Sequence, residues 1–524
     1  MKKQTSIFFT VAISVLFGMA AGLLLLKKET NKLAESYAAN NKLSYILNII
    51  DNEYVDTINK DSLSDLAIRS LLNELDPHSV YLTKEQVKKE NENLSGNFDG
   101  IGIQFRIIGD SIAVVKTIKG GPSEKTGIMA GDRIVKVNGK PLKNLTNDTV
   151  MVLLKGKRGS KVELSVKRRN IPHLINFSVT RDVIKTKALS YVGMLNKDTG
   201  YIKLDEFTAT SHKEVKSALE NLLKQGMKKL VFDLRDNGGG FLDQAIAIAD
   251  EFIEKGDLIV YTDGRLRGRS DAYATSGGLF EKGDLIVMIN ETSASASEII
   301  SGCIQDNDRG KIIGRRTFGK GLVQEQRMLP DNSAIRLTVA RYYTPSGRCI
   351  QRPYIKGDPD KYYEDFIARF SETENYQDTA YHDAKLKYKT KKGRFVYGGG
   401  GIEPDITIPY SVLKHSLYFN SLFKDGLIYK YCFDFTDNNR DMLKQYKDGN
   451  DFIKNFTVSE TLYNNLLNFV KENNKQKPEL SSKEKQEIKQ LMKGYIAQNF
   501  YDDSFFYQIY TTLDTELQTA IANF

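Results

Sequence analysis

Ser293, Ser295 and Ser297 occupy alternate positions among alanines, directly after the apolar run Leu285–Ile289. This pattern predicts a buried strand that leads into a helix, with a serine near the helix N-terminus. Free backbone amides and the helix dipole favour a developing oxyanion at such a position, so a serine there suits nucleophilic attack on a carbonyl. Taken alone, the same stretch also fits a tight turn or a close-packed helix start.

A second loop of the same type follows the strand-like run Leu230–Leu234 and reads Arg-Asp-Asn-Gly-Gly-Gly-Phe. Three consecutive glycines, Gly238 to Gly240, let the backbone expose its amides to a ligand, although a plain turn is the simpler interpretation. In a parallel α/β sheet the ligand crevice lies beyond the carboxyl ends of the strands, which is where both loops are expected.

A nucleophilic serine needs a base, and the histidines of the chain all lie outside these two loops. A single histidine would suffice for a Ser-His pair, so their positions weaken that mechanism without excluding it. Lysine is the alternative, because burial can lower its pKa enough to leave it neutral. Lys320 stands between two glycines, and Gln324 lies four residues on, where its amide could orient the amine. The five histidines are His78, His173, His212, His382 and His415.

The elements that must position these residues follow from the hydrophobic pattern. A chain of 524 residues suggests three or four units. Helical periodicity covers residues 31–89, short strands with glycine turns cover 100–183, and strands alternate with helices over 188–409. Such alternation predicts an α/β core with mostly parallel strands. The remainder, 410–524, has helical periodicity and carries no assignable motif.

The N-terminus predicts a membrane anchor. Ile7–Leu26 contains no charged residue and is flanked by lysines on both sides. A helix of this length crosses a bilayer core. A cleaved signal peptide is the alternative, but the apolar run continues past its small residues, so an uncleaved anchor is favoured. Because lysines flank both ends, the orientation rule does not decide which side the chain faces.

Composition excludes several classes of protein. The net charge of +9 is spread along the chain among acidic residues, which indicates a solubility balance and no nucleic-acid partner. Cys303, Cys349 and Cys432 are odd in number and widely separated, so they make neither a disulfide framework nor a metal site. We expect them to be small buried residues, and we expect no metal and no cofactor.

Taken together, the motifs resemble the C-terminal processing peptidases, also called tail-specific proteases. These are membrane- or envelope-associated serine peptidases with a PDZ domain ahead of a Ser-Lys catalytic core. The resemblance covers roughly residues 40–410 and includes eight motifs in the family's order. The motifs are Leu-Asp-Pro-His-Ser from Leu75, Phe-Asp-Gly-Ile-Gly-Ile from Phe98, Gly-Pro-Ser-Glu-Lys-Thr-Gly from Gly121, Leu-Arg-Asp-Asn-Gly-Gly-Gly from Leu234, Ser-Ala-Ser-Ala-Ser-Glu-Ile from Ser293, Gly-Lys-Gly-Leu-Val-Gln from Gly319, Arg-Tyr-Tyr-Thr-Pro-Ser-Gly-Arg from Arg341 and Gly-Gly-Ile-Glu-Pro-Asp from Gly400.

The resemblance implies a role for each candidate residue of the peptidase core. Ser295 would be the nucleophile, Lys320 the base and Gln324 its support. The oxyanion hole would consist of the Ala296 amide and a second amide from the glycine loop, with Gly239 preferred. That loop reads Asn-Gly-Gly-Gly where many family members have Asn-Pro-Gly-Gly, so the register of the second donor stays open. The two flanking serines would be packing or capping neighbours.

The PDZ module would bind a substrate tail. Its glycine-rich loop would point backbone amides at the terminal carboxylate, and the following strand would accept the tail as an added β-strand. Ile101, Ile103 and residues such as Val152 and Leu153 would line an apolar pocket. The tail-binding loop consists of Gly100, Ile101, Gly102 and Ile103.

The expected fold is a multidomain α+β chain. It begins with a signal anchor over residues 1–28 and an N-terminal helical region over 29–89. A β-rich PDZ domain would cover 90–183, and an α/β peptidase core of crotonase/ClpP-like fold would cover 184–410. A helical C-terminal extension without an assigned role would cover 411–524.

The function implied is that of a serine endopeptidase, which captures protein substrates by their apolar C-termini and cleaves them through an acyl-enzyme. The anchor would hold the peptidase on the outer, periplasmic side of the plasma membrane, or leave it periplasmic if the anchor is cleaved. An oligomer or an adaptor protein remains open. Two other classes also remain: a non-catalytic PDZ scaffold or chaperone, and a crotonase-like hydrolase of small molecules.

Overall fold

The computed structural model describes residues 42–524 except 276, 371–382, 410–414 and 474–479. The predicted anchor over Ile7–Leu26 lies outside the described residues and stays a prediction. Within the described ranges, none of the helices combines the length and the apolar character needed to cross a bilayer.

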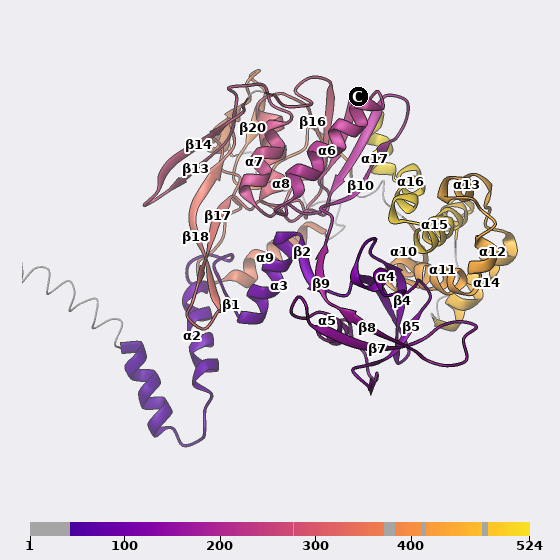
Figure 1. Cartoon of the computed structure of the whole chain (residues 1–524). Coiled ribbons are helices and arrows are strands. Elements are labelled where there is room, and N and C mark those ends of the chain that lie inside the picture. The colour runs from indigo at the N-terminus through magenta and orange to yellow at the C-terminus, as the bar shows by residue number, and fades with distance from the viewer. Residues whose placement is uncertain (1–41, 276, 371–382, 410–414, 474–479) are drawn as a thin grey trace, which may run out of the picture.

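The N-terminal region is helical, as its periodicity predicts, and is joined to the peptidase core by one short strand. A helix over residues 42–53 and part of α2 stand away from the body of the molecule (Figure 1). The strand β1 then pairs antiparallel with β18 of the core, with Val80 opposite Arg336. The turn before β1 is therefore held beside the core. The bounds are α2 (Lys60–Asn73), β1 (Val80–Leu82) and α3 (Lys84–Ser95).

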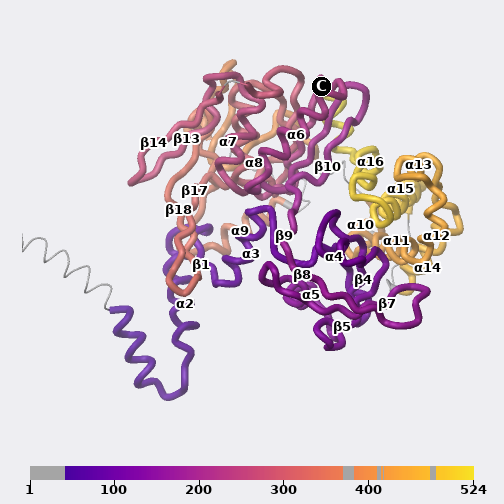
Figure 2. The backbone as a smooth tube through the Cα atoms, in the orientation of Figure 1, coloured from indigo at the N-terminus to yellow at the C-terminus, as the bar shows by residue number. Residues whose placement is uncertain are grey.

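The β-rich module predicted after residue 100 is present. Its strands form an antiparallel sheet of order β3-β4-β5-β7-β8, in which β6 also pairs with β5, and β2 pairs separately with β9. From β9 the chain passes into the peptidase core (Figure 2). The elements are β2 (Asn97–Gly100), β3 (Ile103–Ile108), β4 (Ser111–Thr117), α4 (Pro122–Lys125), β5 (Arg133–Val137), β6 (Lys140–Pro141), α5 (Asn147–Leu154), β7 (Lys161–Lys167), β8 (Ile175–Thr180) and β9 (Asp182–Lys185).

The peptidase core is built on a six-stranded sheet of order β10-β11-β12-β15-β16-β21. Every pair from β11 onward is parallel, which confirms the α/β pattern read from the sequence. Its elements are β10 (Leu189–Met194), β11 (Thr199–Leu204), α6 (Ser211–Lys224), β12 (Lys229–Asp233), α7 (Leu242–Asp250), β15 (Asp284–Ile289), α8 (Ala296–Asp306), β16 (Lys311–Gly314), α9 (Pro359–Ile367) and β21 (Ile406–Thr407).

The predicted strand from Leu258 is present, but contrary to expectation it does not belong to the parallel sheet. It pairs antiparallel with β14 and β18 in a second sheet, since a short turn after Gly264 joins it to β14 and leaves no room for a crossover helix. Besides β1, this second sheet contains β13 (Leu258–Gly264), β14 (Gly268–Tyr273), β17 (Leu322–Met328) and β18 (Ala334–Tyr343). A separate small hairpin pairs β19 (Lys387–Lys389) with β20 (Phe395–Tyr397).

The end of the chain forms a helical unit, here called the C-terminal unit and defined as residues 415–524. Its helices run from beside the PDZ strands β4 and β5 to the edge of the peptidase core (Figure 1). Most of its apolar side chains pack on one another in a core of their own. The helices are α10 (Leu417–Lys424), α11 (Leu427–Asn438), α12 (Arg440–Leu443), α13 (Gly449–Asn455), α14 (Glu460–Asn473), α15 (Ser482–Phe500), α16 (Asp503–Leu513) and α17 (Thr515–Ile521).

The two faces of the parallel sheet are covered by different parts of the chain. Successive residues of a strand point to opposite faces, so Leu230 and Phe232 of β12 pack in the same cluster as α6, α7 and α8. Val231 packs in a second cluster with Leu517 and Ala520 of α17. The last helix of the chain therefore covers one face of the sheet that carries the predicted catalytic loops.

Replacing Leu517 with alanine tests whether α17 belongs to the peptidase core. Leu517 is fully buried, and truncation of a buried leucine removes packing and leaves a cavity. We expect Leu517→Ala to lower the midpoint of thermal unfolding by roughly 5 to 15 °C. Leu266→Ala is the matched control, because Leu266 is 86% exposed. Equal midpoints for the two variants in calorimetry would show that α17 is dispensable for the core.

Candidate active site

The structure separates the three alternating serines by their environment. Ser293 and Ser297 are fully buried, whereas Ser295 is only half-buried. The Ser293 hydroxyl donates to the Leu234 carbonyl at 2.8 Å, and the Ser297 hydroxyl donates to the Asn237 carbonyl at 2.9 Å. These two serines tie the serine loop to the glycine loop, as the prediction of a packing role implies. Of the three serines, only Ser295 is accessible enough to contact a substrate.

The Ser295 backbone adopts a conformation that few residues other than glycine adopt. Its φ is 54° and its ψ is −110°, directly before the first residue of α8. Such backbone strain persists only where the surroundings impose it, and it concentrates at functional sites. Gly239 is part of those surroundings, because a methyl group placed on it would lie 2.9 Å from Ser295 Cβ and 3.1 Å from the Ala296 nitrogen. The glycine loop thus packs directly under the serine.

The buried carboxylate of Glu298 joins the serine loop to the lysine loop. Its Oε2 accepts the Ser295 N–H at 2.8 Å and the Lys320 N–H at 2.9 Å. Its Oε1 accepts the Thr317 hydroxyl at 2.6 Å and the Gly319 N–H at 2.7 Å. Burial raises the pKa of this carboxyl, while the four hydrogen bonds oppose the rise. One side chain therefore fixes the backbone on both sides of the predicted Ser-Lys pair.

Tyr342 of β18 makes a second link between the same two residues. Its hydroxyl lies 2.7 Å from the Lys320 carbonyl oxygen and 3.1 Å from the Ser295 carbonyl oxygen. The side chain is 1% exposed, and burial raises its pKa well above the usual range, so it remains a neutral donor. The backbones of Ser295 and Lys320 are thus held together through both their amides and their carbonyls.

Lys320 lies in an environment that favours its neutral form. Burial is the largest cause of its lowered pKa, and the nearby charge of Arg336 lowers it further. The carboxylates of Glu298, Asp76 and Glu90 act in the opposite direction without cancelling the shift. A lowered pKa is the direction of shift that a lysine base requires.

Residues from the N-terminal turn complete the surroundings of the lysine. Burial and the charge of Lys320 lower the pKa of His78 to about 3, so this histidine is neutral. Its Nε2 lies 3.1 Å from the Tyr362 hydroxyl. Gln324 also reaches this turn, because its amide donates to the His78 carbonyl. Support of the Lys320 amine by Gln324 stays a prediction.

The two candidate oxyanion donors differ in their hydrogen bonding. Ala296 opens α8, and within the described residues no acceptor is bonded to its N–H, as expected for the first amide of a helix. The Gly239 N–H donates to Asn237 Oδ1 at 2.9 Å. Gly238 is exposed, and no acceptor in the described part of the chain is bonded to its N–H. The serine loop and the glycine loop thus each offer one free amide among the described residues.

In the PDZ module, β3 ends the sheet, so one of its edges can accept an added strand. Ile101 is buried in the module core, and Ile103 and Leu153 pack against that core. Val152 is 79% exposed and lies outside the packed interior. Gly102 has a φ of 73°, which keeps the predicted tail-binding loop in a conformation suited to glycine.

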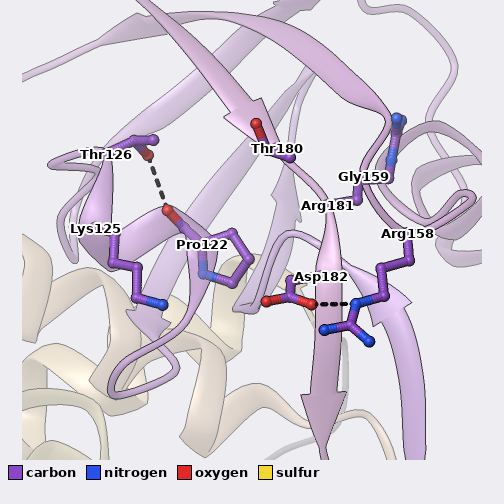
Figure 3. Close-up of a pocket in the computed structure, with 8 residues that line it drawn as sticks. All are labelled: Pro122, Lys125, Thr126, Arg158, Gly159, Thr180, Arg181 and Asp182. Carbon is purple, nitrogen blue, oxygen red and sulfur yellow. Dashed lines mark hydrogen bonds and ion pairs between the residues drawn. The ribbon is translucent and has the colours of Figure 1, made fainter.

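A pocket of about 390 Å³ lies on this module, and its lining comes entirely from residues 122–182 (Figure 3). Arg158 and Asp182 form an ion pair across it at 2.7 Å. Pro122, at its margin, lies beside Gly102 of the tail-binding loop. The lining residues are Pro122, Lys125, Thr126, Arg158, Gly159, Thr180, Arg181 and Asp182.

The cysteines take no part in this arrangement. Cys303 and Cys432 are fully buried, as expected, while Cys349 is half-buried. Burial raises the pKa of all three thiols, so none is a thiolate nucleophile.

Sequence reasoning missed Glu298 and Tyr342 as members of the site. Glu298 stands three residues after Ser295, the spacing of a capping-box acid, which is the signal that could have found it. Tyr342 belongs to the motif from Arg341, which served only as part of the family resemblance. Its contacts with the Ser295 and Lys320 carbonyls depend on the pairing of β17 with β18.

Family models match four parts of the chain. Residues 198–360 match peptidase family S41, and residues 100–179 match the PDZ domain. Residues 20–86 match the activating protease CtpB N-terminal domain. Residues 418–502 match a family of unknown function, DUF8443, which lies within the C-terminal unit.

Two curated relatives decide the family. The carboxy-terminal processing protease CtpA of Bacillus subtilis is 33% identical over 396 residues, which cover 74% of this chain and 82% of the relative. The carboxy-terminal-processing protease of Bartonella bacilliformis is 35% identical over 370 residues, covering 68% and 84%. This chain belongs to the carboxy-terminal processing peptidases. A solved structure, the photosystem II D1 C-terminal processing protease, is 26% identical and covers 71% of this chain and 88% of its own, with a TM-score of 0.35.

As a carboxy-terminal processing peptidase, the chain is a serine-type enzyme. The role of Glu298 can therefore be tested by measuring proteolytic activity. A glutamine at 298 has one oxygen in place of two and turns an NH₂ group toward amide donors. We expect Glu298→Gln to lower kcat by about a hundredfold, the scale on which small displacements of catalytic groups act. Proteolysis of an unfolded reporter, together with thermal unfolding, measures the effect.

Glu281→Gln is the matched control for this test, since Glu281 accepts a single backbone N–H, from Gly278, and glutamine keeps an oxygen for it. Wild-type kcat in Glu298→Gln, or an equal loss in both variants, would remove Glu298 from the site.

Proposed function

We propose that this peptidase captures the C-terminal tail of a protein substrate in its PDZ module and cleaves the chain with a Ser295–Lys320 dyad. The observation that carries the proposal is the shared carboxylate of Glu298, which accepts an amide from each of the two residues on one oxygen. The lowered pKa of Lys320 and the strained backbone of Ser295 support the same assignment.

In the proposed reaction, neutral Lys320 takes the proton of the Ser295 hydroxyl as Oγ bonds to the peptide carbonyl carbon. The carbonyl electron pair moves to its oxygen and gives a tetrahedral oxyanion. When this intermediate collapses, the C–N bond breaks, and the leaving amine takes the proton from the Lys320 ammonium. Water then attacks the ester, gives a proton to Lys320, and the acid is released as Ser295 is reprotonated.

The oxyanion donors proposed are the Ala296 N–H and a second amide from the glycine loop. Ala296 follows Ser295 directly, and Gly239 of the glycine loop packs against both residues. Amides fixed in place stabilise developing charge without reorganising. Gly239, the predicted second donor, serves only if its N–H leaves Asn237 Oδ1. Gly238 is the alternative register, because its amide needs no such change.

The tail would enter the PDZ module at the free edge of β3, with its carboxylate at the loop of Gly100, Ile101, Gly102 and Ile103. Added-strand recognition uses main-chain hydrogen bonds for affinity and apolar pockets for specificity. Substrates are therefore unfolded or exposed protein tails that end in apolar residues. The predicted anchor over Ile7–Leu26, together with the resemblance to envelope-associated peptidases, favours a position on the outer side of the plasma membrane.

An unfolded reporter with an apolar C-terminus tests the dyad and the tail recognition together. We expect wild type lacking residues 1–28 to cleave it, and Ser295→Ala and Lys320→Ala to lose at least about a thousandfold in kcat/KM, as expected when a nucleophile or its base is removed. Capping the reporter tail with Asp-Asp should raise KM, because the added charge cannot enter an apolar pocket. Cleavage that survives Ser295→Ala would place the nucleophile elsewhere, and equal cleavage of both tails would contradict PDZ capture.

The pH dependence tests Lys320 as the base. Only the neutral amine accepts a proton, so kcat/KM should rise with pH through a lysine pKa below its ordinary value of 10.5 and then level off. Arg336→Gln removes a positive charge that lowers this pKa, so the midpoint should move to higher pH by roughly half a unit to one unit. Arg327→Gln is the control, because Arg327 lies on the same hairpin, is 66% exposed and pairs with Glu325. A flat profile, or equal midpoints in all three proteins, would contradict the base assignment.

A further inference from the structure

A buried network of charged residues links the C-terminal unit to the glycine loop. Arg235 follows β12 and stands directly before that loop. Its guanidinium bonds to Asp233 at 2.6 Å, to Asp514 at 2.6 Å and to Glu516 at 2.7 Å. Lys203 donates to the Arg235 carbonyl at 2.9 Å, so the backbone of this residue is held as well. The start of the glycine loop is thus fixed partly by two residues from the far end of the chain.

The same network reaches the lysine loop through Arg315. This residue follows β16 and precedes Thr317, the residue whose hydroxyl donates to Glu298. Its guanidinium bonds to Glu291 at 2.7 Å and also to Glu516. Glu516 therefore contacts two arginines, one before the glycine loop and one before the lysine loop.

The positions of both C-terminal carboxylates are set by the fold of the unit. Asp514 lies at the turn between α16 and α17 and accepts the Leu517 N–H at 3.0 Å, which caps α17. Leu517 packs under the sheet, so the turn cannot shift without disturbing that face. Asp514 and Glu516 are 9% and 4% exposed, so solvent screens their bonds to the arginines only weakly.

The charges of this network indicate that it fixes the positions of the loops more than it increases the stability of the fold. Four carboxylates, from Asp233, Glu291, Asp514 and Glu516, surround two guanidiniums. Replacing one carboxylate with its amide leaves both arginines paired with the others. Buried ion networks contribute little net stability, because desolvation offsets their attraction, but they specify geometry. Variants in which one of these carboxylates is replaced with its amide should therefore fold, but without the ion pair that the carboxylate made.

We propose that Asp514 and Glu516 are positioning residues for the peptidase site, acting through Arg235 on the glycine loop and through Arg315 on the lysine loop. The inference rests on the proposed Ser295–Lys320 function. It gives the end of the C-terminal unit, α17 and the turn before it, a role in catalysis: the active-site loops depend on it for their placement.

The test uses the chain lacking only residues 1–28, as wild type, Glu516→Gln and Asp514→Asn. We expect kcat on the unfolded reporter to fall about ten- to a hundredfold, with KM unchanged, because the reacting groups are displaced and the tail site is not. Labelling of Ser295 by a fluorophosphonate should slow by a similar factor. Hydrogen exchange should become faster at residues 235–240 and 315–321 in the variants, well below the temperature of unfolding.

Glu460→Gln is the matched control, since Glu460 binds Lys485 and Lys489 within the C-terminal unit and makes the same chemical change remote from the core. It should behave as wild type in every measurement. Active variants with wild-type kcat and unchanged exchange would overturn the inference while leaving the proposed function intact. If wild type does not cleave the reporter, the proposed function fails, and exchange in the two loops still decides the inference. A loss of thermal stability with normal kcat and normal labelling would also overturn it.

Discussion

The geometry of the active site depends on one buried carboxylate. Ser295 and Lys320, the proposed nucleophile and base, come from different loops after different strands, and no covalent constraint brings them together. Glu298 does so by accepting backbone amides from Ser295 and Lys320 on a single oxygen, and Tyr342 repeats the link through the carbonyls. Hydrogen bonds to a buried charge are strong and directional, so small displacements of either loop are resisted. The relative position of the proposed catalytic pair is thus set by hydrogen bonds to the backbone of both residues.

That arrangement requires several elements to be rigid at once. The α8 helix carries Glu298 and is entirely buried, since it packs between the sheet and the elements around it. The N-terminal turn at His78 is held by β1 pairing with β18. The charge of Asp76 in this turn raises the pKa of Lys320, whereas burial of the lysine lowers it and has the larger effect. The proposed base needs such burial, because water would restore its ordinary pKa. The N-terminal turn is therefore part of the electrostatic surroundings of the proposed base.

Much of this could be predicted from the sequence, and the limits have physical causes. Period-2 and period-3.6 patterns gave the strands and helices of the core, and the family motifs gave Ser295 and Lys320 as candidates. The second sheet could not be anticipated, because an apolar strand such as Leu258–Tyr261 looks alike whether its partner is parallel or antiparallel. Glu298 and Tyr342 were missed because their roles depend on contacts between segments distant in sequence. Two of the charged partners of Arg235, Asp514 and Glu516, lie 279 and 281 residues away, which no local pattern records.

The C-terminal unit brings the PDZ module and the peptidase core into one structure. On the PDZ side, Arg133 pairs with Asp437 at 2.8 Å, Lys116 pairs with Asp503 at 2.7 Å, and Arg106 of β3 stacks over the Tyr429 ring. The far end of the unit packs under the parallel sheet. The module is therefore held at two places, by the chain after β9 and by these contacts. A tether at one point would leave the module free to rotate about a linker, whereas two attachments fix β3 relative to Ser295. Under the proposed tail capture, this limits which peptide bonds can reach Ser295.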